Sequence, residues 1–166
     1  MTNSAGRRDE GEIRGDRTVV RPAVEDDADL LVRWHADPDV ARYWDDETFT
    51  RAEMLERLRR RDVEAFVVEE RGRPVGYLQV WREGDAGGLD MFLIPEVRGR
   101  GLGPDAGRAV ARYLREERRW RRVTVDPYVW NEEATRAWMR AGFRPVEERE
   151  PDAEHTSRWL LMEFEG

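Results

Sequence analysis

The sequence predicts an α/β (α+β) fold in which helices flank a mixed, mostly antiparallel sheet. Three strand-like segments, residues 65–69, 75–82 and 89–94, follow one another with turn residues between them, a pattern typical of an antiparallel meander. Two segments with apolar residues at helical spacing come after them and alternate with short strand-like segments. The chain has 166 residues, enough for one domain with a short tail, and no repeat or linker divides it.

The N-terminal part is predicted to contain a tail, one strand and three helices. Residues 1–16 are polar, and we expect them to form a mobile N-terminal tail before a single domain at residues 17–166. A short strand is predicted at 18–21, and helices are predicted at 26–35, 39–44 and 51–60. The last helix follows Thr50 and Glu53, which have the spacing of a capping box.

The C-terminal part is predicted to alternate strands and helices. Residues 84–88 read as a turn and residues 95–103 as a loop that leads into a long amphipathic helix. A strand at 122–126 comes next, followed by Asn131, a good N-cap, and Gly142, which suits the end of the helix. The last two strands are predicted at 143–147 and 158–164.

Composition excludes several classes of function. The formal net charge is −7, with 36 acidic residues, so nucleic acid is not expected as a partner and a cationic small molecule is. All basic residues are Arg, so no phosphate-binding or Schiff-base lysine is present. Without Cys and with only two His, a metal site is not expected. No apolar run or signal segment is seen, so we expect a cytoplasmic protein without membrane contact, and the Arg bias is typical of a bacterial genome rich in GC.

A glycine-rich loop is the most specific motif. It comprises Arg98, Gly99, Arg100, Gly101, Leu102 and Gly103, between a predicted strand and a predicted helix. Glycines allow close approach of a ligand to the backbone, and successive N–H groups at a helix N-terminus bind anions such as a pyrophosphate. The glycine spacing is neither that of a dinucleotide-binding motif nor that of a P-loop. The alternative is a flexible turn that simply begins a helix.

The chain resembles the GNAT acetyltransferases. Their Arg/Gln-x-x-Gly-x-Gly/Ala signature is matched by Arg98, Gly101 and Gly103, and their second landmark by Asn131, Gly142 and Phe143. The resemblance implies a sheet with a splayed central strand pair, with acetyl-CoA as co-substrate bound in the splay. It implies that Phe92 and Ile94 offer backbone groups to the pantetheine and thioester, and that the loop amides hold the pyrophosphate. It also places Leu93, Asn131 and Trp138 beside the coenzyme.

A narrower resemblance is to the aminoglycoside 6'-N-acetyltransferases. Residues 40–47, 88–93 and 126–131 carry it. It implies that Asp90 is the catalytic base and that Trp44, Asp45 and Asp126 contact the substrate. The alternatives for Asp90 are an anchor for substrate charge and a residue that bonds within the sheet. For Asp126 the alternative is to cap the turn at Pro127, for Asp45 a solvated loop, and for Trp44 the core.

The sequence departs from the family pattern at two positions. Trp138 stands near the place of a tyrosine proposed to protonate the leaving thiolate, and an indole cannot titrate. Pro104 lacks an N–H that could face a phosphate. The predicted reaction is direct acetyl transfer to a primary amine, in a monomer or homodimer. A protein N-terminus, a polyamine or a siderophore hydroxylamine are other acceptors, and a non-catalytic acyl-CoA-binding module is the rival class. We interpret His35 and His155 as structural.

Overall fold

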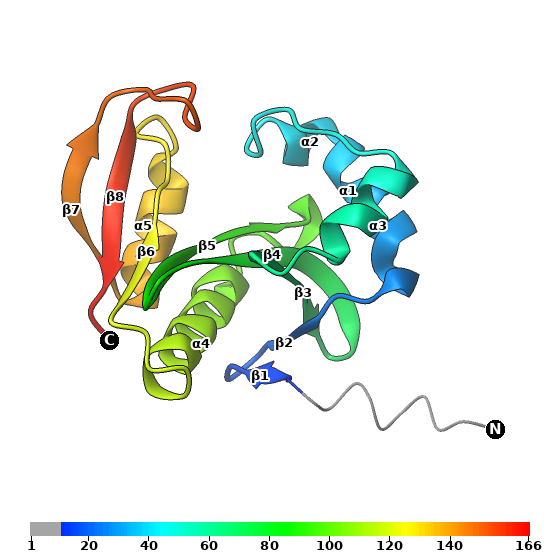
Figure 1. Cartoon of the computed structure of the whole chain (residues 1–166), viewed down its shortest axis with the longest axis horizontal. Helices are drawn as coiled ribbons and strands as arrows, with labels where there is room; N and C mark the ends of the chain where they lie inside the picture. The colour runs from blue at the N-terminus through cyan, green and yellow to red at the C-terminus, as the bar shows by residue number, and fades with distance from the viewer. Residues whose placement is uncertain (1–10) are drawn as a thin grey trace.

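A computed structural model describes residues 11–166, and within them eight strands form one sheet (Figure 1). The strand order is β1-β2-β3-β4-β5-β6-β8-β7. The strands are β1 (Ile13–Arg14), β2 (Val19–Pro22), β3 (Val63–Glu70), β4 (Arg73–Glu83), β5 (Ala86–Leu93), β6 (Arg122–Val125), β7 (Phe143–Arg149) and β8 (Trp159–Phe164). Among the described strand pairs, only β5 and β6 run parallel. The predicted mixed, mostly antiparallel sheet is confirmed.

Helices cover both faces of this sheet. The α-helices are α1 (Ala28–Ala36), α2 (Pro38–Ala41), α3 (Arg51–Leu58), α4 (Leu102–Glu116) and α5 (Glu132–Ala141), and the two 3-10 turns are η1 (Glu25–Asp27) and η2 (Pro95–Val97). Side chains alternate along the strands: Leu78 packs in the core under α4, whereas Tyr77 packs with Leu31 and Met54 of α1 and α3. Within the described part, no helix is both long and apolar enough to span a bilayer.

The central strands β5 and β6 diverge. They pair only where Ala86–Gly88 lies beside Arg122–Thr124, and the rest of β5 continues without a partner on that side (Figure 1). The expected splayed pair is therefore present. Because β4, β5 and α1–α3 lie on one side of the divergence and β6–β8 with α5 on the other, the opening between them is the natural place for a ligand.

Two sequence predictions about β5 and its neighbours need correction. The predicted turn at 84–88 is shorter, since Ala86, Gly87 and Gly88 belong to β5 and form its contact with β6. Glycine is needed there because a Cβ at Gly87 would lie 2.1 Å from the Trp81 carbonyl oxygen. The second predicted helix is also shorter: α2 ends at Ala41, and Asp45 and Asp46 have positive φ values of 53° and 54°.

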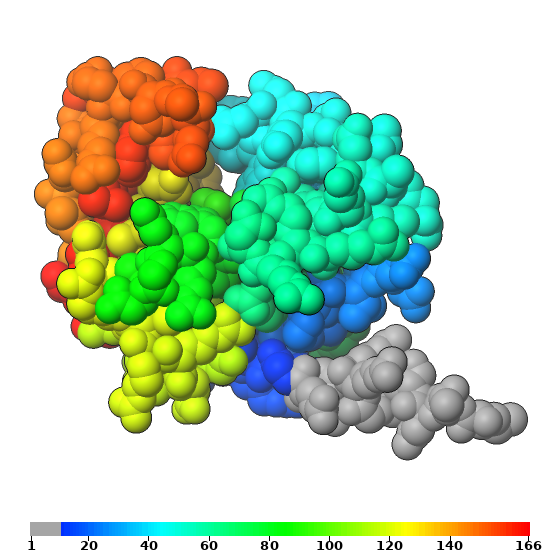
Figure 2. All heavy atoms as spheres, viewed as in Figure 1, coloured from blue at the N-terminus to red at the C-terminus, as the bar shows by residue number. Residues whose placement is uncertain are grey.

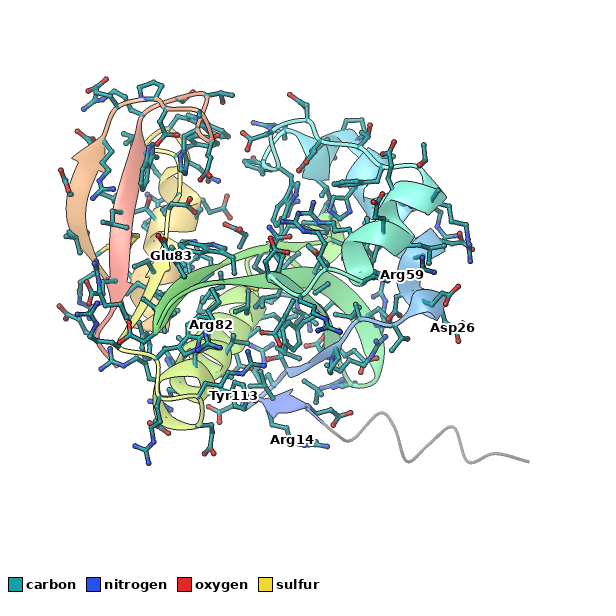
Figure 3. The ribbon with its side chains drawn as sticks, in the orientation of Figure 1. Arg14, Asp26, Arg59, Arg82, Glu83 and Tyr113 are labelled. Atoms are coloured by element: carbon teal, nitrogen blue, oxygen red, sulfur yellow. The ribbon has the colours of Figure 1, made fainter. Side chains whose placement is uncertain are left out.

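The predicted N-terminal tail, residues 1–16, is too long, because it includes a strand. Ile13–Arg14 forms β1, which pairs with β2 through Ile13 and Val20. Ile13 is buried, and β1 lies beside α4, as the positions of Arg14 and Tyr113 illustrate (Figure 3). The polar composition predicts a tail. The carboxylate of Asp105, nearly ninety positions later, accepts the Asp16 N–H and anchors the end of this segment, and no local pattern indicates that contact. Residues 1–10 of the predicted tail lie outside the described residues.

Candidate active site

The open side of β5 presents alternate backbone groups to the divergence. The Ile94 N–H donates to the Val75 carbonyl oxygen at 2.9 Å, and Phe92 pairs with Tyr77 in the same antiparallel register. Backbone groups of such a strand point in alternate directions, so those of Met91 and Leu93 face the opening. The expected backbone roles of Phe92 and Ile94 are therefore wrong: both residues direct these groups to β4.

The glycine loop adopts the conformation that an anion-binding loop requires. Gly99 and Gly101 have φ values of 76° and 82°, in the left-handed region that favours glycine, and Gly101 is the N-cap of α4. A Cβ added at Gly99 would meet nothing within 4 Å. The first N–H groups of α4, from Leu102 and Gly103, have no partner within the helix, and Pro104 supplies none. The loop and helix end together form an open cradle of backbone donors.

The two arginines of the loop are engaged with the protein. Arg98 donates through Nε to the Leu93 carbonyl oxygen at 3.1 Å and through a terminal nitrogen to the Asp39 carbonyl oxygen at 2.9 Å. Arg100 pairs with Glu70 at 3.0 Å. These contacts hold the loop in shape, so Arg98 and Arg100 act first as anchors of the loop and the cradle consists of backbone groups.

One pocket runs from this loop along β5 to α5. Of the residues expected beside the coenzyme, those that line it are Phe92, Leu93, Arg98, Gly99, Gly101, Leu102, Gly103, Asn131 and Trp138. Ile94 and Arg100 do not line it. Asn131 caps α5 by accepting the Ala134 N–H at 3.2 Å, as predicted. Trp138 forms part of the wall and packs against Gly107, where a Cβ would approach the indole to 2.8 Å. A non-titrating residue thus closes the α5 side.

Asp90 lies on β5 beyond the pocket, within a hydrogen-bonded network that the sequence did not reveal. Gln79 donates to the Asp90 carboxylate at 3.0 Å and accepts from Tyr77 Oη at 3.0 Å and from Arg57 at 2.7 Å. Burial raises the pKa of Asp90 to about 7, with a further rise from the negative charge of Asp126, while the Gln79 hydrogen bond opposes both. Only the β4–β5 register, which pairs Gln79 with Asp90, could have identified this partner.

Asp126 follows β6 and faces both Asp90 and a histidine. His155 Nε2 lies 2.6 Å from Asp126 Oδ2, and its Nδ1 lies 2.8 Å from Asp152 Oδ1. The sequence interpretation treated His155 as structural because nothing in the chain indicated that the β7–β8 loop returns to the end of β6. His35 by contrast lies fully buried among aromatic rings, and its ring fits the structural interpretation.

Asp45 and Trp44 occupy different environments, although they are adjacent. Asp45 is exposed and accepts a hydrogen bond from Tyr128 Oη at 2.6 Å, which joins the α2–α3 segment to the segment after β6. Trp44 packs edge-on against Tyr77 and Phe92 at centroid distances of 5.7 and 5.3 Å. The alternative of a core role therefore describes Trp44 better than the substrate contact that the resemblance implied. Figure 2 shows the surface hollowed between the β7–β8 loop and the α2–α3 segment.

The arrangement combines two features: a backbone cradle with a pocket on one side of β5, and a carboxyl with a pKa near neutrality between acidic loops on the other. A family model described as acetyltransferase (GNAT) domain matches residues 23–151. The chain belongs to the GNAT acetyltransferase family. The family that the Arg98, Gly101 and Asn131 motifs indicated is thus confirmed, and the GNAT match covers both the glycine loop and the strands that diverge beside it.

Solved structures share the fold at low sequence identity. AAC(6')-Ib in complex with paromomycin and acetyl-CoA superposes with a TM-score of 0.79 and 23% identity, over 90% of this chain and 93% of that one. A GNAT acetyltransferase from Bacillus anthracis gives 0.80 and 17%, over 92% and 97%. Spermidine N-acetyltransferase from Vibrio cholerae, with coenzyme A and spermine, gives 0.79 and 14%, over 89% and 95%. These similarities establish the GNAT fold of this chain.

Proposed function

We propose that this GNAT chain transfers an acetyl group from acetyl-CoA to a primary amine of a cationic small molecule, with the 6'-amine of an aminoglycoside as the leading acceptor. The observation that carries the proposal is Asp90. Its carboxyl lies on β5 next to Met91, which lines the pocket, and interacts with Asp126, and its pKa of about 7 suits proton transfer at neutral pH.

The pocket fits acetyl-CoA, which supplies the activated acetyl thioester. The cradle of Gly99, Gly101 and the start of α4 suits the pyrophosphate, because a helix N-terminus and glycines at positive φ offer several N–H groups to one anion. The pantetheine arm would follow β5, where the Leu93 and Met91 backbone groups face the opening. Asn131 and Trp138 would lie along its other side. No metal is required for this reaction.

Asp90 handles the proton in this proposal. An amine acceptor is mostly an ammonium at pH 7, with a pKa of about 10, and only the free amine can attack a thioester. Asp90 takes the proton, directly or through a water, while Gln79 holds its carboxylate in place. The amine nitrogen bonds to the acetyl carbon and releases its second proton to solvent, and the carbon–sulfur bond breaks. Since a thiol has a pKa of about 8.5, protonated Asp90 is acidic enough to return a proton to the leaving sulfur.

The acceptor side favours a molecule with several amines. Asp45, Asp90 and Asp126 present carboxylates from three separate elements around the opening. An acceptor with several ammonium groups would gain a charge-assisted hydrogen bond at each. Two similar folds were solved with such molecules, AAC(6')-Ib with kanamycin and the Vibrio cholerae enzyme with spermine. Acetylation of an aminoglycoside in the cytoplasm of a bacterium would confer antibiotic resistance.

One observation favours a second candidate, a non-catalytic acyl-CoA-binding module. Trp138 closes the α5 wall where a titratable tyrosine is expected in the family, and an indole N–H can donate a hydrogen bond without titrating. The two candidates differ in a measurable way, because a binding module would hold coenzyme A and release no thiol.

The test is free-thiol release from acetyl-CoA with panels of aminoglycosides, polyamines, hydroxylamines and N-terminal peptides, with mass spectrometry of the products. We expect turnover on aminoglycosides that carry a 6'-amine and none on those with a 6'-hydroxyl. Turnover only with another panel would support acetyl transfer but would exclude an aminoglycoside as the acceptor. Coenzyme binding without thiol release on any amine would overturn the proposal in favour of the binding module.

A further inference from the structure

His155 is held between two carboxylates that come from different parts of the chain. Its Nε2 contacts Asp126 Oδ2 at 2.6 Å, after β6, and its Nδ1 contacts Asp152 Oδ1 at 2.8 Å, in the β7–β8 loop. Ionised carboxylates only accept hydrogen bonds, and a neutral imidazole can donate from just one nitrogen. Two such contacts at once therefore require the doubly protonated, positively charged imidazolium.

The surroundings fix this ring and favour its charge. The imidazole stacks on Trp159 at a centroid distance of 4.1 Å and meets Tyr128 edge-on at 6.1 Å. The facing charged groups are Asp126 from the end of β6, Asp152 from its own loop, and the Arg149 guanidinium over the Trp159 ring from β7. Burial opposes the charge of His155, but the hydrogen bonds and charges of the two aspartates outweigh it and raise its pKa.

Asp126 connects this histidine to the reacting centre. Asp90 and Asp126 each lie two residues beyond the last β5–β6 pair, Gly88 with Thr124, and the charge of Asp126 raises the pKa of Asp90. His155 contacts Oδ2 of Asp126, and Oδ1 of the same carboxylate has the capacity to accept from a second donor. An incoming ammonium group that reaches Asp90 would find that oxygen beside it.

We infer that His155 is a positioning residue for the acceptor: its imidazolium holds Asp126 so that the acceptor's ammonium and the histidine share one carboxylate. The inference rests on the proposed function, because it assumes an amine acceptor at Asp90. It makes His155 more than a structural residue of the β7–β8 loop. It also predicts a reciprocal effect, since a second cation on Asp126 must disfavour the charge on the imidazole.

The first experiment measures that effect by NMR titration of ring-labelled histidine. The sequence has two histidines, and burial lowers the pKa of His35, so their signals titrate differently. In the free protein we expect His155 to titrate above pH 6.5. Saturating kanamycin should lower its pKa by about 0.3 or more, whereas coenzyme A alone should leave it unchanged. An unchanged His155 pKa at saturating kanamycin would overturn the shared carboxylate.

The second experiment separates positioning from loop structure. His155→Gln keeps a donor but removes the charge, and we expect the acceptor KM to rise about tenfold with the coenzyme KM unchanged. Glu154→Gln is the matched control, since it removes a charge from an exposed neighbour in the same loop and should change neither KM. In an Asp126→Ala background, His155→Gln should have no further effect, because His155 acts through Asp126. If His155→Gln raises the acceptor KM by the same factor in the Asp126→Ala background as in the wild type, the inference is overturned.

The outcomes also distinguish this inference from the proposed function. If no amine is acetylated but kanamycin still lowers the pKa of His155, the positioning role stands and the proposed reaction fails. If acetylation occurs as proposed while His155→Gln behaves like Glu154→Gln, the reaction stands and the positioning role fails. If neither thiol release nor a pKa change is seen, both are overturned.

Discussion

The two sides of the β5–β6 opening are built in different ways. On the proposed coenzyme side, the groups that would face the ligand are backbone atoms of a strand, a loop and a helix start, and these are fixed by regular structure and glycine conformation. On the proposed acceptor side, the groups that would face the substrate are side chains from three loops and one strand, held by single contacts such as Tyr128 with Asp45. Local sequence can therefore preorganise the coenzyme side of the opening, whereas the acceptor side depends on contacts between loops that are far apart in the chain.

The coenzyme side has an additional anchor from the N-terminal segment. The Asp105 carboxylate, in the first turn of α4, accepts the N–H groups of Asp16, Arg17 and Thr18 at 3.0–3.1 Å and the Thr18 hydroxyl at 2.7 Å. Arg17 then donates to the Arg100 carbonyl oxygen at 2.5 Å. The last residue of the predicted tail, Asp16, and the two residues after it therefore hold the glycine loop from outside, without facing the pocket.

The largest expected effect comes from Asp90→Asn, at the junction of the two sides. Removing the base should lower kcat by about 100-fold or more and raise the acceptor KM, with the coenzyme KM little changed. The pKa of Asp90 is raised to about 7, so the basic form is present above that pH, and wild-type kcat should rise as pH increases through 7. The variant should lack this rise. Equal rates at saturating substrate across pH 6–9 would exclude Asp90 as the base.

Thermal unfolding provides the folding control for Asp90→Asn. The pKa of Asp90 is higher in the folded state than in the unfolded chain, so its ionisation destabilises the fold. This destabilisation grows as pH rises from the ordinary aspartate pKa to about 7 and is complete above pH 7. The amide cannot ionise, so the variant should be more stable than wild type at pH 8, by about 1–2 kcal/mol. A less stable variant would show that Asn disturbs the Gln79 network, and a loss of activity could then not be assigned to the base.

The next effect should be confined to the coenzyme side. Gly101→Ala forces a Cβ onto a residue with φ of 82° at the N-cap of α4, which costs about 1–3 kcal/mol and disturbs the cradle. We expect the coenzyme A Kd, measured by calorimetry, to rise about tenfold. Gly84→Ala is the matched control, because its φ is 65° and its Cβ would meet nothing within 4 Å, in the β4–β5 turn. Equal weakening in both variants would contradict a local role for Gly101.

A smaller effect on the same side is expected from Asp105→Asn. Losing the carboxylate weakens its bonds to the N-terminal segment, which should cost about 1–3 kcal/mol and raise the coenzyme KM about threefold to tenfold. Burial opposes ionisation of Asp105, but the hydrogen bonds from Thr18, Arg17 and Asp16 lower its pKa. Its contribution to stability is therefore present above its ordinary pKa and is lost as pH falls through the lowered value.

The difference in Tm between wild type and Asp105→Asn should thus be greatest near neutral pH and should shrink toward pH 3. A pH-independent difference would contradict the carboxylate's role. Asp29→Asn, at an exposed position on α1, is the control and should change neither the coenzyme KM nor the acceptor KM.

The smallest effect should be confined to the acceptor side. Tyr128→Phe removes the hydroxyl that donates to Asp45 at 2.6 Å and accepts the Thr156 N–H at 3.2 Å. The two loops would then have to be ordered on binding, so the acceptor KM should rise about threefold while the coenzyme KM stays constant. Steady-state kinetics with each substrate varied in turn measures both. A parallel rise in the coenzyme KM would show that the two sides are not separable.

Local sequence predicted the elements whose signals lie within a few residues. The capping box of Thr50 and Glu53 is confirmed, and so are the Asn131 cap and the Gly142 end of α5. In each case the interacting groups are neighbours in the chain, so their spacing alone defines the contact. The glycine loop belongs to the same class, because positive φ is a property of the single residue.

Tertiary structure decided which groups face the opening. The prediction for Phe92 and Ile94 failed because a shift of one residue in strand register reverses the direction of every backbone group, and the β4–β5 pairing sets that register. Gln79 reached Asp90 through the same pairing. Asp105 was missed as an anchor because its partners lie nearly ninety residues earlier.

The sequence by itself thus determined the family, the order of the elements and the residues of the glycine loop, since these depend on local patterns. The tertiary structure alone decided that burial and the charge of Asp126 raise the pKa of Asp90 and that His155 joins Asp126 to Asp152. Burial and charge pairing between residues far apart in the chain depend on which elements pack together. Such contacts leave no fixed spacing in a single sequence, which is why the hydrogen-bonding partners of Asp90 and Asp126 became visible only in the fold.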